Sequence, residues 1–376
     1  MELVINKNTL VNALQLITPI TDKSSSKPIL SNFVLRTVGE PGDEGEVELS
    51  ATDYEIAVRG TFKAQVRKQG SICVSARKML ETCREFMAEE IQISDDEQLW
   101  VTVAGGPSRL RLPSVEIGLY PQMEFNDLGH KFRMSAKELR RCIDLTLFAA
   151  QSNETRKNLM GVCLHIGEDR HARWTATDGH RLAQVVREVT PEGNTGFPEI
   201  IIPRKSLVEM QKVLDAAAEE VAISFDERSL VLAANGVSLM TRLIEGTFPN
   251  VEPIIPRDND KVLVVERERL INGLKIISFM SSEKIKPVKL SLQGGKLRLE
   301  SEHVESGEAF DELDVDYSGE DFQIGFNAQY LLDVLSVARH GERVRLELKG
   351  ALNPCLISVP EDASFLSVVM PLKIEW

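Results

Sequence analysis

The sequence lacks any long apolar run. No stretch of about 18 consecutive apolar residues occurs in the 376-residue chain, so we expect no membrane-spanning helix. The first ten residues, MELVINKNTL, do not combine a basic segment with an apolar one, so no secretion signal is expected. The 5 cysteines are scattered without CxxC spacing, which is typical of reduced core residues in a cytosolic protein. We therefore expect a cytoplasmic location.

Motifs for catalysis and for cofactors are also missing. There is no GxxxxGK[ST] phosphate loop, HExxH, GxSxG, or GxGxxG after a strand. The 6 histidines include no pair four residues apart and no set of cysteines at zinc-ligand spacing, so no metal site is indicated. The glycine pairs at 104–108 (AGGPS) and 293–296 (QGGK) are typical of hairpin turns. We expect no cofactor and no enzymatic activity.

The sequence also has no excess of basic over acidic residues, and its net charge is −13. At face value this argues against a nucleic-acid partner. The acidic residues, however, cluster in strand-like or loop-like stretches such as 41–48, 94–98 and 311–321. Basic residues such as Arg204 and Lys205 fall on helix-like segments instead. The net charge therefore does not exclude an acidic exterior with a locally basic face.

Three segments repeat a short apolar strand followed by an amphipathic helix. They are residues 2–17, 131–147 and 261–277. Apolar residues recur in them at helical spacing, and these are Leu10, Leu14 and Ile17, then Leu139, Ile143 and Leu147, then Leu270, Leu274 and Ile277. A second strand-and-helix unit recurs at 71–83, 199–211 and 322–335, with Ser75, Pro203 and Asn327 at the expected helix starts.

Strand patterns occupy most of the remaining sequence. The stretch SATD before residue 54 recurs as TATD before residue 179, and LYPQM at 119–123 recurs as TFPNV at 247–251. The chain thus contains three copies of about 125 residues, each with two helices and many strands. Because strands outnumber helices, we predict an α+β fold in which helices pack on antiparallel sheets. The expected domains are 1–128, 129–257 and 258–376.

Residues 175–186, TATDGHRLAQVV, invite two interpretations. In the first, His180 is a general base oriented by Asp178, as in a hydrolase. In the second, Asp178 and Gly179 form a tight turn in which the glycine supplies a positive φ. The first copy keeps the Thr-Asp pair at 52–53 but lacks the histidine, so we favour the turn.

Motifs from all three copies resemble one family. They are SATDYEIAVRG, VSARKMLETC, RKNLMGV, TATDGHRLA, IIPRKSLVEM, EGTFPNVEPIIP, DVDYSGEDFQIGFNAQYLLDVL and VVMPLKIEW. Together they resemble the bacterial DNA polymerase sliding clamp, the β subunit of polymerase III, from end to end. The resemblance implies a non-catalytic processivity factor that tethers the replicative polymerase. It also implies a head-to-tail homodimer whose three repeated domains per chain close into a ring around duplex DNA.

The family resemblance further implies a hydrophobic pocket between the second and third domains. This pocket takes short linear peptides from the replicative polymerase α subunit, the clamp loader, repair polymerases and mismatch-repair proteins. The residues it implies are Leu159, Thr177, Gly179, His180, Arg181, Leu182, Pro249, Ile254, Asn327, Tyr330, Val368, Val369, Met370, Pro371 and Leu372. Apolar walls with a few polar groups suit a peptide anchored by leucine or aromatic side chains.

Two further residue sets follow from the family resemblance. Packed at roughly 8–10 Å, the twelve helices of a dimer would line a hole wide enough for a duplex. The expected contacts to DNA phosphates are Lys23, Lys27, Arg77, Lys78, Asn153, Arg156, Arg204, Lys205, Lys284 and Lys286. The expected dimer interface comprises Leu110, Leu112, Phe279 and Met280.

Two other functions compete with the sliding clamp. One is an acidic repeat scaffold that binds proteins but not DNA. The other is a hydrolase that uses Asp178 and His180, which the missing nucleophile and oxyanion motifs disfavour.

Overall fold

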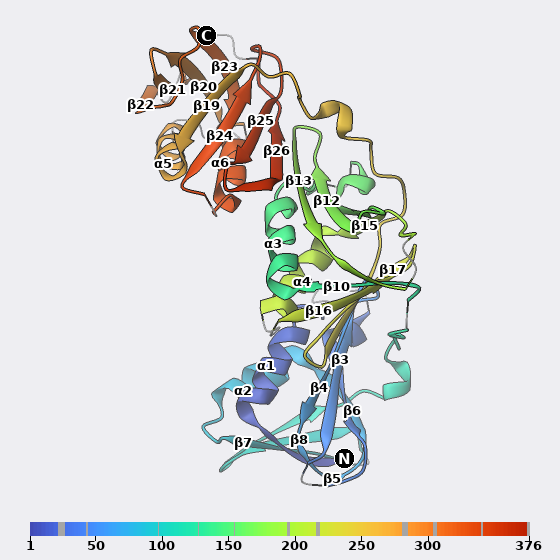
Figure 1. Ribbon diagram of the computed structural model, residues 1–376. Helices are drawn as coiled ribbons and strands as arrows, with labels where there is room; N and C mark the ends of the chain where they lie inside the picture. Colours follow the sequence, from blue (N-terminus) through green and yellow to red (C-terminus); the bar gives the residue numbers. More distant parts are fainter. Residues whose placement is uncertain are drawn as a thin grey trace. The chain divides into compact units, whose positions relative to one another are not determined.

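The computed structural model describes residues 1–21, 27–42, 44–96, 98–126, 128–153, 155–193, 196–215, 219–279, 285–303, 307–339 and 341–373. The chain forms two compact units (Figure 1). The first comprises residues 1–140, 190–196 and 205–243, and the second comprises 141–189, 197–204 and 244–376. The α-helices of the described ranges are α1 (Lys7–Ile17), α2 (Ala76–Glu85), α3 (Ala136–Leu147), α4 (Arg204–Asp215), α5 (Arg267–Ser278) and α6 (Ala328–Val337).

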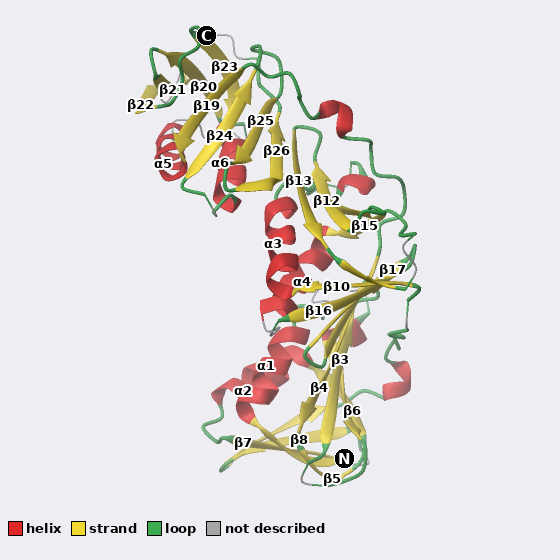
Figure 2. Cartoon of the chain, viewed as in Figure 1, coloured by secondary structure: helices red, strands yellow, loops and turns green. Residues whose placement is uncertain are grey.

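The first unit contains two antiparallel sheets. The larger one has the order β14 (Thr190–Glu192), β10 (His130–Ser135), β16 (Glu220–Phe225), β17 (Ser229–Ala234), β18 (Val237–Arg242), β4 (Ile56–Lys63), β3 (Glu46–Thr52), β2 (Asn32–Val38) and β6 (Ser71–Ser75). The smaller has the order β5 (Gln65–Lys68), β1 (Glu2–Asn6), β7 (Glu90–Asp95), β8 (Trp100–Gly105) and β9 (Ser108–Pro113). Helices α1 and α2 pack against each other, and α1 lies on β3 and β4 (Figure 2).

The second unit is built in the same way. Its larger sheet has the order β15 (Ile200–Pro203), β11 (Gly161–Ile166), β12 (His171–Thr177), β13 (Arg181–Glu188), β26 (Asp362–Val369), β25 (Cys355–Val359), β24 (Arg343–Leu348) and β19 (Lys261–Glu266). Its smaller sheet has the order β22 (Gly307–Asp314), β21 (Lys296–His303), β20 (Pro287–Gln293) and β23 (Phe322–Asn327). Helices α5 and α6 pack together here (Figure 2).

The repeats are joined by strand pairing. In each repeat one antiparallel meander ends in β4, β13 or β22, and a second meander ends in β9, β18 or β26. Strand β4 of the first repeat pairs with β18 of the second, and β13 of the second pairs with β26 of the third. The corresponding strands β9 and β22 each pair on one side only within the described part of the chain. Two of the three possible junctions are thus made within one chain.

The predicted repeats and their helices are confirmed. The apolar stripes at Leu10, Leu139 and Leu270 are buried, and the residues that follow them at helical spacing are buried too. An exception is Leu147, which is half-buried because it is the last residue of α3, where the packed face ends. The expected helix starts also hold. The Ser75 side chain accepts a hydrogen bond from the Lys78 amide at 3.4 Å, and Asn327 accepts one from the Gln329 amide at 3.0 Å.

The expected hairpin turns and core cysteines are present as well. Gly294 and Gly295 join β20 to β21 with φ of +57° and +77°, a conformation that glycine adopts without steric cost. All cysteines are buried thiols, and burial raises the pKa of Cys73 to about 11. None of the described helices has the length and apolar character that a membrane crossing requires.

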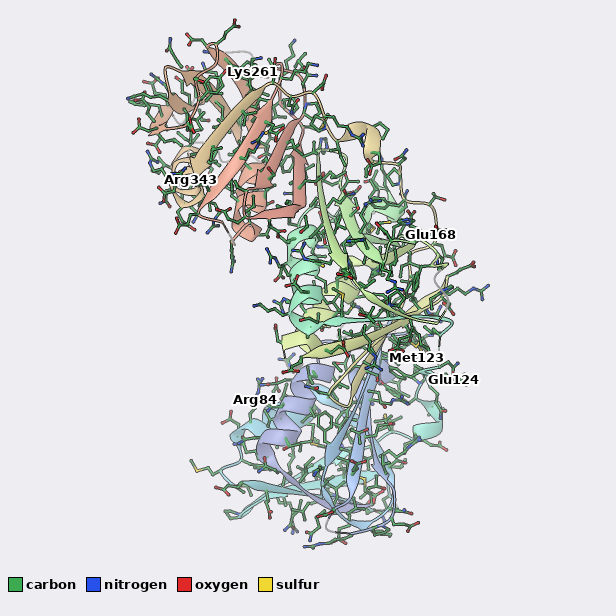
Figure 3. All side chains as sticks on the ribbon, viewed as in Figure 1. Arg84, Met123, Glu124, Glu168, Lys261 and Arg343 are labelled. Carbon is green, nitrogen blue, oxygen red and sulfur yellow. The ribbon has the colours of Figure 1, made fainter. Side chains whose placement is uncertain are left out.

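Charged side chains lie at the surface of both units, for example at Arg84, Glu168 and Arg343 (Figure 3). The acidic stretch at 311–321 begins on the exposed strand β22. Basic residues such as Arg77 project from a helix and are exposed. The expected basic groups on helices and acidic groups on strands are thus present at these positions, although α2 also carries Glu81 and β10 also carries Arg133.

A carboxylate fixes the junction between β13 and β26. Asp362 Oδ2 accepts from Arg141 Nη2 on α3 at 2.5 Å and from Arg187 Nη2 on β13 at 3.0 Å. The Asp362 side chain is only 12% exposed. Burial raises the pKa of this carboxyl, but the Ser364 hydroxyl and the two guanidinium groups lower it more. The pKa therefore lies below its ordinary value.

Asp362→Asn should lower the free energy of unfolding by about 1.5–3 kcal/mol at neutral pH, the usual loss for a charge-assisted hydrogen bond. Because the folded pKa is depressed, this stabilisation is present above the unfolded pKa of about 4 and is lost as pH falls through the folded pKa. Urea denaturation at several pH values measures both effects. The exposed control Asp260→Asn, which removes an ion pair with Lys261, should change little. An Asp362→Asn deficit that stayed constant down to pH 2 would contradict this account.

Candidate functional site

The turn between β12 and β13 is held by its own side chains. Thr177 Oγ1 donates to the Arg181 carbonyl at 2.7 Å and accepts from the Gly179 amide at 3.1 Å. Asp178 Oδ1 accepts from the amides of His180 and Arg181 at 2.9 and 3.0 Å. Gly179 has a φ of +89°. The Thr-Asp pair is a turn-forming element, as predicted.

The first repeat builds the same turn between β3 and β4. Thr52 Oγ1 donates to the Ile56 carbonyl at 2.8 Å, and Asp53 Oδ1 accepts from the Ile56 amide at 2.7 Å. Tyr54 occupies the position of Gly179 and holds a φ of +76°, which is uncommon for a residue with a side chain. Local hydrogen bonding therefore accounts for the repeated Thr-Asp pair.

The structure does not support a catalytic pair at this turn. The second oxygen of Asp178 binds Arg181 Nε at 3.1 Å. The His180 ring stacks on Tyr330 instead, with ring centroids 6.1 Å apart and planes at 21°. The carboxylate and the imidazole thus serve different neighbours, which argues against the hydrolase interpretation. The described residues also contain no group of three or more potential metal ligands.

Arg181 links strand β13 to helix α6. Its side chain is 12% exposed and forms an ion pair with Asp333 in addition to the one with Asp178. The guanidinium lies 4.7 Å from the ring centre of Tyr330 and 5.5 Å from that of Phe148. Burial and the Asp178 carboxylate raise the pKa of the Tyr330 hydroxyl, so this phenol is neutral at physiological pH. The second and third repeats therefore share one charged and aromatic cluster.

Beside this cluster lies a patch of apolar side chains. Its buried members are Leu159, Cys163, Leu182, Ile201, Phe248, Val251 and Val368, with Ile244, Ile255, Leu356 and Leu366 packed against them. Three expected peptide-binding residues, Leu159, Leu182 and Val368, are thus core residues that form the base of the patch. Ile254 is 44% exposed, and Pro249 and His180 are exposed too.

The last strand completes this region. Val369 faces Arg181 and Val368 faces Leu182 in the ladder between β26 and β13. Beyond β26 the Met370 amide donates to the His180 carbonyl at 2.9 Å, and the Leu372 amide donates to Gly325 at 2.8 Å. Met370, Pro371 and Leu372 are half-buried. Expected peptide-binding residues from the second repeat, such as Leu159, and from the end of the third, such as Leu372, therefore both lie near the β13–β26 junction.

The whole chain matches known domain families and proteins. Residues 1–124, 133–250 and 252–373 match the N-terminal, central and C-terminal domains of the DNA polymerase III beta subunit. The beta sliding clamp of Caulobacter vibrioides is 32% identical over 381 residues, with 100% of both chains covered. That of Pseudomonas putida is 30% identical over 376 residues, with the same coverage.

Solved structures agree. A sliding clamp from Bartonella birtlesii, bound to griselimycin, has a TM-score of 0.93 at 31% identity, with 100% of both chains covered. The Caulobacter crescentus clamp has a TM-score of 0.92 at 32% identity and covers 100% of this chain and 99% of its own. The chain belongs to the DNA polymerase III β-subunit family. It is a sliding clamp of DNA replication, a non-catalytic processivity factor whose family architecture is a ring of two chains.

The residues expected to contact DNA lie in several environments. Lys27, Arg77, Lys78, Asn153, Arg156 and Lys205 are exposed, Lys286 is half-buried, and Lys23 and Lys284 lie outside the described residues. Arg204 differs, because its Nη1 donates to the carbonyls of Leu147 and Ala150 at 2.6 and 3.3 Å. Burial and the neighbouring Arg181 lower the pKa of Arg204. This guanidinium caps the end of α3, which makes it less available to a phosphate than the exposed side chains.

The expected dimer residues also differ from one another. Phe279, just after α5, is 85% exposed, and Leu110 on β9 is half-buried. Leu112 is 5% exposed because its side chain faces the core of its own repeat, so it contributes little to a surface. Met280 lies outside the described residues.

Sequence reasoning missed several members of the junction. Asp333 lies in the third copy of the second strand-and-helix unit, and no local pattern indicates its pairing with Arg181. The burial of Phe248 and Val251 could have been predicted from the sequence. Both belong to TFPNV, which repeats LYPQM, and both are part of the buried patch. Repeat-matched apolar residues in a loop-like segment are the signal that could have found them.

Gly179→Ala should lower the free energy of unfolding by about 1–2 kcal/mol, the cost of a left-handed conformation for a residue with a Cβ. The added methyl group meets only one side-chain atom, at 3.6 Å, so the loss is conformational rather than steric. Gly118→Ala is the matched control, because that glycine has open space and no positive φ. Denaturant unfolding of both variants measures the difference, and equal effects would count against the strained turn.

Proposed function

We propose that two chains close head to tail by pairing β9 of one chain with β22 of the other. The support is the repeated junction: β9 is the repeat counterpart of β18 and β26, and β22 is the counterpart of β4 and β13. Pairing them would complete a third junction of the same kind and remove two exposed strand edges. Phe279 and Leu110 supply apolar surface near this junction.

The double variant Leu110→Asp and Phe279→Asp should give folded monomers of 42.0 kDa, because two carboxylates are placed in an apolar contact. Light scattering at micromolar concentration measures the mass. The loaded parent protein should stay on circular DNA and leave linear DNA from its ends, whereas the variant should be retained on neither. Leu119→Asp with Leu352→Asp is the control pair, since both leucines are exposed elsewhere. A double variant that stayed dimeric would rule out this junction.

We also propose that a set of basic and amide groups reaches DNA phosphates without reading the bases. The set is Lys23, Lys27, Arg77, Lys78, Asn153, Arg156, Lys205, Lys284 and Lys286. Several of these have protein partners in the free chain: Arg77 pairs with Glu81 at 2.7 Å, and Lys205 pairs with Asp53. The Arg77–Glu81 pair is exposed on both sides and therefore weak, so phosphates can compete for that guanidinium. In the other pair the Lys205 side chain is exposed, although that of Asp53 is buried. Such contact is loose enough for sliding.

The surface around the β13–β26 junction is the proposed peptide-binding site. Its base is the apolar patch that includes Leu159. Its polar groups are the His180 ring and the backbone near Met370. We expect an extended peptide with apolar anchors, from the polymerase α subunit, the clamp loader, repair polymerases or mismatch-repair proteins. Since these partners act on the chromosome, we place the protein in the bacterial cytoplasm.

Met370→Ala should weaken binding of a fluorescein-labelled polymerase α-subunit peptide by about 1–3 kcal/mol, the usual loss for an interface anchor. His180→Ala should have a smaller effect, because its ring is exposed and stacks on Tyr330. Fluorescence anisotropy measures the affinity, and the melting temperature reports on folding. Met87→Ala is the control, because that methionine is fully exposed on the first repeat. Unchanged affinity in the Met370 variant would refute the proposed site.

A further inference from the structure

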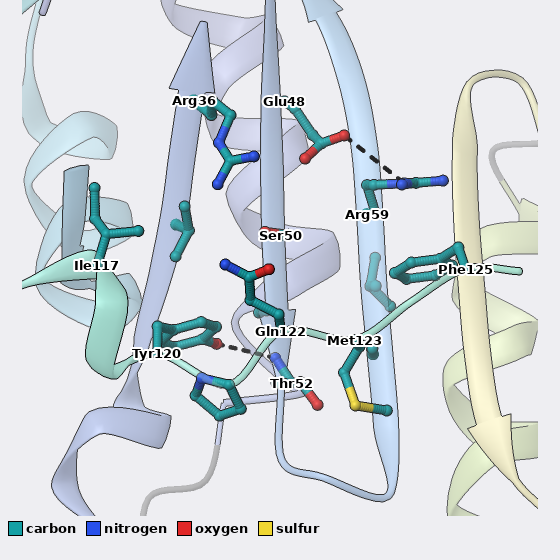
Figure 4. A pocket seen from close by; sticks show the side chains of 15 residues that line it. Arg36, Glu48, Ser50, Thr52, Arg59, Ile117, Tyr120, Gln122, Met123 and Phe125 are labelled. Atoms are coloured by element: carbon teal, nitrogen blue, oxygen red, sulfur yellow. Dashed lines mark hydrogen bonds and ion pairs between the residues drawn. The ribbon is translucent and has the colours of Figure 1, made fainter. Parts of the chain in front are cut away.

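The first repeat carries a cavity on the face of its larger sheet (Figure 4). Its volume is ≈ 160 Å³. Strands β2, β3 and β4 form its floor, and residues 117–125 form its cover. The floor residues are Val34, Ser50, Ala51, Thr52, Ala57 and Val58. Nothing in the function proposed above uses this cavity.

Tyr120 holds the cover against the floor. Its hydroxyl accepts a hydrogen bond from the Thr52 amide at 3.0 Å (Figure 4). It also donates to the Asn32 carbonyl at 3.1 Å. The ring packs with buried Val34 and Cys73. The cavity therefore has a wall that is fixed by both polar and apolar contacts.

The cavity repeats the construction of the surface at the β13–β26 junction. Both lie beside a Thr-Asp turn, at 52–53 and at 177–178. Both are bordered by the segment that ends a repeat, 119–123 or 247–251, with an aromatic residue packed into a buried cluster. Both flank the strand that pairs with the next repeat.

The rim of the cavity carries an uncompensated positive charge. Arg59 Nε lies 3.8 Å from Glu48, and the Arg59 guanidinium stacks on Phe125 at 4.4 Å. Arg36 projects from β2 at the same rim (Figure 4). Among the described residues the Arg36 side chain has no hydrogen bond or ion pair, and the lining holds one carboxylate, Glu48, for two guanidinium groups.

The volume of the cavity and the distance between its floor and its charged rim indicate what kind of ligand fits. The lining mixes apolar groups, such as Val34 and Val58, with polar ones, such as Ser50 and Thr52. A space of about 150 Å³ is the size of a benzene ring, so one apolar side chain fits among the apolar groups. Val34 on the floor and Arg36 on the rim are two residues apart on the same strand, which corresponds to roughly 6–7 Å. Side chains two residues apart in an extended peptide have the same separation.

We propose that this cavity binds an extended peptide that carries an apolar side chain and, two residues away, an aspartate or glutamate. The apolar side chain fills the space between β3 and the cover, and the carboxylate accepts hydrogen bonds from Arg36. This would give each chain a second peptide site, at a different junction from the one around Met370.

Methionine methyl groups report on the two sites separately, because Met123 lines the cavity and Met370 lies at the other junction. The dimer is labelled at the methyl carbons of its 10 methionines, and Met123→Leu and Met370→Leu assign the two signals. The probe is acetyl-Gly-Ser-Phe-Ser-Asp-Gly-amide, whose blocked end removes the terminal carboxylate. Titration should shift the Met123 signal with saturation.

Replacing the aspartate of the probe by asparagine, or introducing Arg36→Glu, should weaken this binding about tenfold or more, because a charge-assisted hydrogen bond is lost. Arg228→Glu, the same charge change at an exposed turn between β16 and β17, should leave it unchanged. Circular dichroism confirms that both variants are folded.

A Met123 signal that stays fixed at millimolar probe overturns the inference, and so does equal weakening by Arg36→Glu and Arg228→Glu. A third result also overturns it: the asparagine probe binds when its C-terminus is a free carboxylate but not when it is amidated. The cavity would then recognise a chain terminus and not an aspartate or glutamate side chain. The Met370 signal, followed with the polymerase peptide, reports on the proposed function independently of these results.

Discussion

Backbone hydrogen bonding between strands of different repeats supports every larger feature of this chain. Leu239 faces Val58 where β18 joins β4, and Leu182 faces Val368 where β13 joins β26. Such ladders turn edge strands, which are prone to unspecific pairing, into interior strands. They also place each Thr-Asp turn next to the segment that ends a repeat. Both peptide sites proposed above depend on this placement.

The sequence predicts the repeats and their helices well, because an amphipathic helix is a local pattern. The stripe through Leu10, the cap at Ser75 and the glycine turn at 294–295 each depend on residues a few positions apart. Strand pairing across a junction is different. Met240 pairs with Ala57 in a ladder far apart in sequence, and no pattern within either strand selects that partner. The division into two compact units, which cuts through the second repeat, follows from this long-range pairing.

The candidate site shows the same limit. Turn chemistry at Asp178 could be predicted, because the carboxylate binds backbone amides two and three residues ahead. The role of Arg181 could not, since its partner Asp333 lies on a helix of another repeat. Arg204 is a further example: its sequence context suggests a solvent-facing cation, yet it caps the end of α3. Charged residues acquire their roles from tertiary neighbours, and the family resemblance could supply only the general location.

The two single-sided strands, β9 and β22, differ from each other, so each chain would offer two unlike ends. Assemblies built from unlike ends close into rings only if the rotation from chain to chain returns to its start; otherwise they grow as open filaments. A substitution that tilts one of the small sheets, while leaving its edge able to pair, would therefore convert a finite assembly into a polymer. The curvature of these sheets, more than the strength of the edge contact, would then determine whether the chains form a closed ring or an open fibre.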